Sequence, residues 1–187
     1  MNEFTFKQGD GLLIVDVQND FCPKGALPIE GGDAVVPVLN RWIDAALALK
    51  APVYASRDWH PLAHLSFKEQ GGEWPPHCLQ DSDGARFHPD LKLPDAVVKI
   101  TKGVRFDQDQ NSVFDQTGFA VRLKRDGVKR LFVGGLALDV CVLASVLDAI
   151  KNGFGVRLLL EATRPVKPES GQQAIKEMKA AGAVILD

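Results

Sequence analysis

One cysteine stands where a strand, a turn and a helix are expected to meet, a setting that can make a thiol nucleophilic. An apolar run at residues 131–133 precedes Gly134 and Gly135, and apolar residues recur at helical spacing after Cys141. A thiol in the first turn of a helix lies near free backbone N–H groups and the positive end of the helix dipole, which both lower its pKa. We therefore take Cys141 as a candidate nucleophile, although a cysteine at the start of a buried helix is more often a packing residue.

Two charged residues could move the proton of this thiol. Asp16 ends an apolar run that begins at Gly11, and Lys102 follows another apolar run. A carboxylate beside the thiol can take its proton and later give it to a leaving amine, while an ammonium group stabilises both anions. Backbone N–H groups around Ala137 and Cys141 could hold an oxyanion. The alternatives are that Asp16 caps a turn and that Lys102 is a solvated side chain.

All four histidines lie in one turn-rich region at about residues 58–93, which indicates a metal-binding loop. Asp58 and His60 are two residues apart, so in extended backbone both side chains point the same way. His77 follows two prolines and is a third candidate ligand. One carboxylate and two imidazoles with open positions suit zinc, iron or manganese, so we expect one divalent metal ion, zinc before the others. His64 is a possible further ligand or a partner of one, although loop histidines are more often simply exposed to solvent.

The other two thiols, Cys22 and Cys78, lack the strand–turn–helix setting and are interpreted as packing residues. Three cysteines do not form a disulfide framework, and the first ten residues lack the pattern of a signal peptide, which favours a cytoplasmic protein. The net charge is -2 and the lysines and arginines are scattered, so we expect no nucleic-acid partner. No apolar run is long enough for a membrane span. The expected partner is a small-molecule substrate, and a homo-oligomer is possible.

Apolar runs alternate with helical patterns along the chain, which predicts βαβ units and a parallel sheet. Strands are expected at residues 11–17, 51–58, 96–100, 129–134, 155–160 and 183–186, and helices at 33–49, capped by Asp33, within 114–126, and at 139–151 and 168–181. The prediction is an α/β fold, a three-layer α-β-α sandwich around a six-stranded, mostly parallel, doubly wound sheet, in a single domain over residues 1–187. Because the carboxyl ends of such strands meet at one edge, Asp16, Asp58, Lys102 and Cys141 should converge there.

With these residues assembled, the chain resembles the nicotinamidases of the isochorismatase-like cysteine hydrolase superfamily. The resemblance covers nearly the whole chain, residues 12–186. Its matching segments are residues 15–21 (VDVQNDF), 57–61 (RDWHP), 74–78 (WPPHC), 101–103 (TKG) and 135–142 (GLALDVCV). The order Asp, Lys, Cys marks the superfamily, and the D-x-H and W-P-x-H-C pair is the more specific signal for the nicotinamidase branch.

The resemblance implies an activity and a mechanism. It implies hydrolysis of nicotinamide to nicotinate and ammonia, a step of NAD salvage, through a thioester on Cys141 that forms with the help of Asp16 and Lys102. It also implies an oxyanion hole made by the backbone N–H groups of Ala137 and Cys141, with a cis peptide bond just before Ala137. The metal would hold the pyridine nitrogen and orient the substrate rather than generate the nucleophile.

Four further positions bear on the substrate. Phe21 and Trp74 match aromatic positions that sandwich the substrate ring in the family, although both could also be core aromatics. Leu138 stands where the family usually has threonine, and Asn111 where it usually has tyrosine. These departures leave two alternatives open, namely hydrolysis of another small amide, such as a carbamoyl or ureido compound, and a catalytically inactive binding module.

Overall fold

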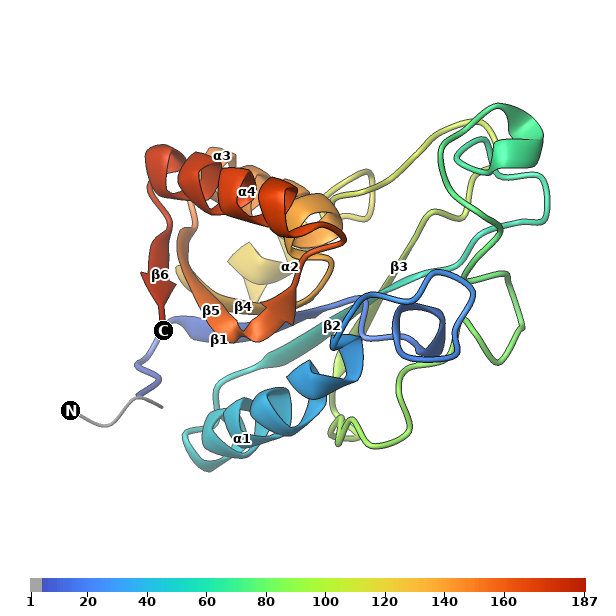
Figure 1. Ribbon diagram of the computed structural model, residues 1–187. Coiled ribbons are helices and arrows are strands. Elements are labelled where there is room, and N and C mark those ends of the chain that lie inside the picture. Colours follow the sequence, from blue (N-terminus) through green and yellow to red (C-terminus); the bar gives the residue numbers. More distant parts are fainter. Residues whose placement is uncertain (1–4) are drawn as a thin grey trace.

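The computed structural model describes residues 5–187, and its centre is a six-stranded sheet in which every strand pairing is parallel (Figure 1). The strands, in the order β3-β2-β1-β4-β5-β6, are β3 (Val98–Lys102), β2 (Val53–Asp58), β1 (Asp10–Val15), β4 (Arg130–Leu136), β5 (Gly155–Arg164) and β6 (Val184–Leu186). The strand order reverses between β1 and β4, as in a doubly wound sheet. The predicted fold class is confirmed, and the sheet is wholly parallel rather than mostly so.

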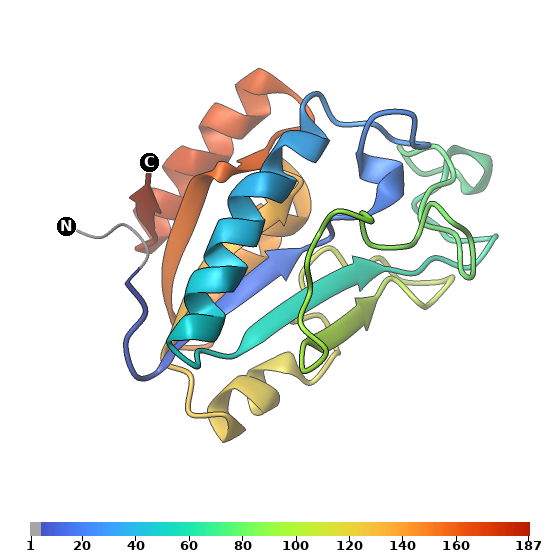
Figure 2. The same cartoon turned by 90° about the horizontal axis from the view of Figure 1, so that it is seen from below.

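Helices cover both faces of the sheet and make the outer layers of the sandwich (Figure 2). Helix α1 (Val35–Ala48) packs on one face, and α2 (Phe119–Arg125), α3 (Leu143–Lys151) and α4 (Pro168–Ala181) lie on the other. Successive side chains of β1 alternate between these layers, because side chains of a strand point to opposite faces. Leu12 and Ile14 belong to the core cluster on the α1 side, and Leu13 and Val15 to the cluster on the α3 and α4 side.

Three helix starts differ from the prediction, and α3 begins at Leu143 instead of residue 139. A short 3-10 turn, Gly32–Ala34, precedes α1, whose N-cap residue is Ala34 without a side-chain cap. The expectation that Asp33 caps this helix is therefore wrong, because Asp33 lies inside the turn. Helix α2 begins only at Phe119, after a turn in which the Thr117 hydroxyl donates to the Val113 carbonyl at 2.5 Å.

Three strands run further than predicted: β5 continues to Arg164, and the extensions of β3 and β4 position candidate site residues. Strand β3 ends at Lys102, which pairs in register with Asp58 on β2. Strand β4 continues through both glycines to Leu136, so the glycines do not form the turn. Gly135 has a φ of +122°, and a Cβ atom there would overlap the Val15 carbonyl oxygen. Glycine at this position thus allows β4 to approach β1 closely.

The long segment between β2 and β3 holds one short 3-10 turn, Lys68–Gln70, and isolated bridges at His60–Leu79 and Phe67–Trp74. Its first part lies beyond the carboxyl ends of the strands, together with the segment that follows β3 (Figure 1). Its last part returns past α1, where the Asn40 side chain donates to the Asp90 carbonyl, to the start of β3 (Figure 2). Within residues 5–187, no helix is both long and apolar enough to cross a membrane.

Candidate active site and metal centre

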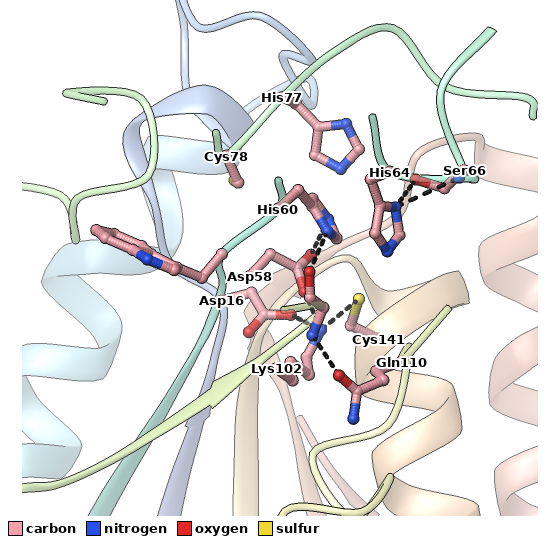
Figure 3. A network of polar contacts seen from close by, with 12 residues as sticks. Asp16, Asp58, His60, His64, Ser66, His77, Cys78, Lys102, Gln110 and Cys141 are labelled. Carbon is pink, nitrogen blue, oxygen red and sulfur yellow. Dashed lines mark hydrogen bonds and ion pairs between the residues drawn. The ribbon is translucent and has the colours of Figure 1, made fainter. Parts of the chain in front are cut away.

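The four polar residues predicted at strand ends do converge at the carboxyl edge of the sheet (Figure 3). Asp16 directly follows β1 with a left-handed φ of +47°, Asp58 ends β2, Lys102 ends β3, and Cys141 lies in the turn after β4. All four are buried, none more than 6% exposed. Three neighbouring parallel strands and the turn after a fourth therefore bring the acid, the lysine and the thiol to one place.

Lys102 is the centre of this cluster. Its Nζ atom lies 2.8 Å from Oδ2 of Asp16, 2.5 Å from Oδ1 of Asp58 and 3.4 Å from Sγ of Cys141. Burial acts to lower the pKa of Lys102, but the neighbouring carboxylates and the Cys141 sulfur outweigh it and raise the pKa well above its usual range. The side chain is therefore an ammonium group held between three potential anions.

The cysteine lies in a π-helical turn rather than in the first turn of an α-helix. This turn spans Leu138–Val142, and the Val142 N–H donates to the Ala137 carbonyl at 3.0 Å. The expectation of a lowered thiol pKa is wrong. Burial raises the pKa of Cys141 well above its usual range; Lys102 opposes this and the nearby carboxylates add to it. The thiol is therefore neutral at rest and needs a base.

Asp16 is placed to be that base. Burial raises the pKa of the Asp16 carboxyl group, and the Lys102 ammonium group offsets part of the rise. Its Oδ1 atom accepts a hydrogen bond of 2.7 Å from the Ser56 hydroxyl group, which fixes the carboxylate. Sequence reasoning missed Ser56. The available signal was its position two residues before Asp58 on the same strand, which puts both side chains on one face of the sheet.

The predicted metal ligands Asp58, His60 and His77 form a second, adjacent cluster. Each offers a donor atom within 4.8 Å of the others, and all three side chains are buried. Nδ1 of His60 donates to the Gly103 carbonyl at 2.9 Å, and Nδ1 of His77 donates to the Pro75 carbonyl at 2.8 Å. Because a carbonyl only accepts, both rings keep the lone pair of Nε2 for a ligand. Burial also lowers the pKa of His77, which favours the neutral, metal-binding form. This donor set fits a divalent ion such as zinc.

His64 lies beside this cluster but outside its donor set. Its ring centroid is 4.1 Å from that of His60. Nδ1 of His64 is 2.7 Å from the Ser66 hydroxyl oxygen and accepts the Ser66 N–H at 3.3 Å. Nε2 of His64 is buried and has no hydrogen-bond partner among the described residues. His64 therefore packs against a candidate ligand, and its role as a further ligand stays a prediction.

A cavity opens above both clusters, and Phe21 and Trp74 line it together with Ala137 and Cys141. The peptide bond between Leu136 and Ala137 is cis, at the position that the resemblance implies. Residues not anticipated from the sequence complete the wall: the apolar Leu27, Ile29, Val140 and Val166, and the polar Ser66 and Asp109. Asn111, noted above as a departure, also lines the cavity. A flat ring between aromatic and apolar walls would thus meet the thiol on one side and the donor set on another.

Comparison with known proteins shows the family of this chain. Residues 10–187 match the model of the isochorismatase domain. The chain belongs to the isochorismatase family. A nicotinamidase of Escherichia coli K12 is 38% identical, with 93% of this chain and 92% of that protein covered.

Solved structures of the family are also similar. A pyrazinamidase of Pyrococcus horikoshii in complex with zinc has a TM-score of 0.93 at 42% identity, covering 96% of this chain and 99% of that one. PnC1 from L. infantum in complex with nicotinate has a TM-score of 0.88 at 38% identity, covering 100% of this chain and 94% of that one. The match thus extends over the whole fold that carries both clusters.

Within this isochorismatase-family chain, Asp139 supplies hydrogen bonds behind the turn that carries Cys141, bonds that the Leu138 side chain cannot make. Oδ1 of Asp139 accepts the Val166 N–H at 2.8 Å, and Oδ2 accepts the Lys167 N–H at 3.3 Å and the Ser170 hydroxyl group. Leu138 is buried in the core cluster on the α3 and α4 side. The turn is therefore fixed by Asp139 on one side and by apolar packing on the other.

Proposed function

We propose that this chain is a metal-dependent cysteine amidohydrolase that converts nicotinamide to nicotinate and ammonia. One observation carries the proposal: the Lys102 ammonium group contacts Asp16, Asp58 and Cys141 below the cavity that also holds the donor set. The similar proteins named nicotinamidase and the nicotinate complex support the choice of substrate. A cytoplasmic role in NAD salvage is part of the proposal.

Acylation begins with the neutral Cys141 thiol. It passes its proton to Asp16 as Sγ attacks the amide carbon, and the charge moves from sulfur to the amide oxygen. The backbone N–H groups of Ala137 and Cys141 donate to this oxyanion. Asp16 then protonates the leaving nitrogen, ammonia departs, and the acyl group remains as a thioester on the cysteine. Lys102 keeps its charge throughout and stabilises the anions formed in turn beside it.

Deacylation repeats these steps with water. Asp16, again a carboxylate, takes a proton from the water molecule that attacks the thioester carbon. The tetrahedral intermediate collapses, nicotinate leaves, and Cys141 regains a proton. A metal ion on Asp58, His60 and His77, zinc being the first choice for this donor set, would supply a Lewis acid that fixes the pyridine nitrogen. Phe21 and Trp74 would hold the faces of the ring.

An ammonia-release assay on the zinc-loaded protein tests this proposal. The substrates are nicotinamide, pyrazinamide, benzamide, which lacks the ring nitrogen, and a carbamoyl compound. We expect release from the first two, little from benzamide, and none from nicotinamide with Cys141→Ala, while Cys22→Ser and Cys78→Ser remain active. Intact-mass analysis of a quenched reaction should show one acyl group on the wild-type chain.

Two results would reject the proposal in different ways. Hydrolysis of the carbamoyl compound alone would favour another amidohydrolase of the family. No turnover of any amide by folded, zinc-loaded protein would favour a binding module.

A further inference from the structure

The segment that follows Asp16 contains a fully buried glutamine whose side chain extends the sheet. Strands β1 and β2 pair only as far as Ile14 and Ala55, after which the Asp16 N–H donates to Ser56. Beyond that point the Gln18 amide takes over. Its Oε1 atom accepts the Asp58 N–H at 2.8 Å, and its Nε2 atom donates to the Asp58 carbonyl at 2.8 Å. The side chain thereby satisfies both backbone groups of Asp58, which a longer β1 would otherwise pair.

The same amide reaches a third segment. Nε2 of Gln18 also donates to the Ala85 carbonyl at 2.9 Å, so the oxygen and both N–H groups of this amide are used. Gln18 is 0% exposed, so solvent does not compete for these bonds in the folded chain. The backbone of Asp58 is therefore fixed to the chain two residues after the candidate base.

Asp20, two residues further on, makes the corresponding contact with the segment that carries His77. Its Oδ2 atom accepts the Cys78 N–H at 2.7 Å, and its Oδ1 atom accepts the Ala26 N–H at 3.0 Å. Cys78 has a left-handed φ of +45°, so the chain turns sharply directly after His77. Among the described residues Asp20 takes part in no ion pair, so backbone N–H groups alone hold this buried carboxylate.

His60 is tied to the same segment through the backbone. The His60 N–H donates to the Cys78 carbonyl at 2.8 Å, and the Gln80 N–H donates to the His60 carbonyl at 2.9 Å. Two side chains therefore hold the backbone that carries the three candidate ligands. Gln18 holds Asp58, and Asp20 holds the segment that carries His77 and pairs with His60. Neither side chain belongs to the donor set itself.

We propose that Gln18 and Asp20 are positioning residues that preorganise the metal site and lock its distance from Asp16 and the thiol. This rests on the proposed function, because it concerns the same metal. Residues that hold ligands without touching the metal change its affinity by roughly 10–100-fold when substituted. If the three candidate ligands were disordered without metal, part of the binding free energy would be spent on ordering them. Ligands already held by these hydrogen bonds avoid that cost.

Zinc affinity of the metal-free protein, measured by competition with a chromogenic chelator, tests the proposal without any substrate. Asp20→Asn keeps the shape but sets an amide NH₂ group against a backbone N–H, and Gln18→Met keeps the length but removes three bonds. We expect each to weaken zinc binding by roughly 10–100-fold. Asn19→Ala is the matched control, because Asn19 lies between them and its side chain donates outward to the Asp83 carbonyl.

A second readout separates positioning from general stability. The alkylation rate of Cys141 in the metal-free variants reports on the turn that carries this residue, and thermal melting reports on the fold. Weaker zinc binding with the wild-type alkylation rate supports the proposal. Wild-type zinc affinity in both variants, or an equal loss in Asn19→Ala, overturns it.

Hydrogen exchange of the wild-type protein needs no variant and keeps the proposal testable if the substituted chains do not fold. The amides of Asp58 and Cys78 should be protected without zinc nearly as well as with it. Protection of these amides that appears only with zinc would overturn the proposal, since the metal and not the chain would then order the ligands. A wild-type protein that binds no zinc at all would instead count against the proposed function.

Discussion

Oδ1 of Asp58 lies 2.5 Å from Nζ of Lys102, so a candidate metal ligand is also a partner of the lysine beside the thiol. Its other oxygen, Oδ2, lies 3.6 Å from Nε2 of His60. Burial acts to raise the pKa of Asp58, but the Lys102 ammonium group outweighs it and holds the pKa below its usual range. The carboxylate is therefore charged at neutral pH and joins the two clusters.

Removal of the buried ammonium group should destabilise the fold and stop the reaction. In Lys102→Met, Asp16 and Asp58 would face each other without a cation, which we expect to cost about 3–5 kcal/mol of unfolding free energy. Lys99→Met is the matched control, because Lys99 is exposed on the same strand. It should change stability by less than about 0.5 kcal/mol. Urea unfolding measures both, and equal effects would contradict the central role of Lys102.

Substitution of single histidines should reveal which of them hold the metal. His60→Ala and His77→Ala should each weaken zinc binding by more than the roughly 10–100-fold expected for residues outside the ligand set. His64→Ala should have a smaller effect, because its donor atoms lie outside the set. His88→Ala should have none, because this fourth histidine is also outside the set and its Nδ1 atom accepts the Asp90 N–H. Chelator competition measures all four variants. A loss in His64→Ala as large as that in His60→Ala would make His64 a fourth ligand.

A hydrogen bond at the opposite end of the sheet should make stability depend on pH. The Tyr54 hydroxyl group donates to Oδ2 of Asp126 at 2.8 Å, and Nε of Arg122 lies 2.6 Å from the same atom. Burial acts to raise the pKa of Asp126, but Arg122 and Tyr54 outweigh it and lower the pKa. The stabilisation is therefore present above the unfolded-state pKa of about 3.9 and lost as the pH falls through the lower folded-state value.

Unfolding free energies measured from pH 7 to pH 2.5 test whether the stabilisation by Asp126 is lost as the pH falls. The stability of the wild-type chain relative to Asp126→Asn should be greatest at neutral pH and should shrink below about pH 4. Tyr54→Phe should cost about 1 kcal/mol at neutral pH. A difference between wild type and Asp126→Asn that is constant with pH would show that the carboxylate is not stabilised in the fold.

Loss of Asp139 should loosen the turn that carries Cys141. Asp139→Ala leaves the N–H groups of Val166 and Lys167 without their acceptor, which we expect to cost about 1–3 kcal/mol and to lower kcat more than it raises KM. Ser170→Ala removes one bond and should cost about 1 kcal/mol. Glu177→Ala, exposed on α4, is the control. Steady-state kinetics with thermal melting will show whether kcat falls, and an unchanged kcat would contradict the structural role of Asp139.

The convergence of Asp16, Asp58, Lys102 and Cys141 was predictable because carboxyl ends of parallel strands share an edge. What the sequence could not show was the degree of burial. The thiol of Cys141 was expected to ionise easily from its place near a helix start. In the fold it lies in a water-excluded cluster beside two carboxylates, and these raise its pKa.

The sequence also could not predict hydrogen bonds between polar side chains and residues far away along the chain. Ser56 and Gln18 bond across 40 residues, to Asp16 and Asp58 respectively, and no periodic pattern marks such pairs. The Asp33 cap was wrong because a capping residue type was taken as a helix start, whereas a 3-10 turn holds that position. Because the family usually has threonine where Leu138 stands, the sequence could not show which group makes the hydrogen bonds behind this turn. In the fold, Asp139 makes them.

The close pairing of β1 with β4 has a consequence for folding. It joins positions such as Asp10 and Arg130, which lie 120 residues apart and form an ion pair at the far end of the same two strands. Residues 10–102 carry the acid, the lysine and the donor set, and the thiol arrives only with the second half of the chain. Strand pairing between residues so far apart in the sequence forms slowly. If the chain were divided between β3 and α2, neither fragment alone should hydrolyse the amide. Activity regained on mixing the fragments would show that β1 and β4 had paired.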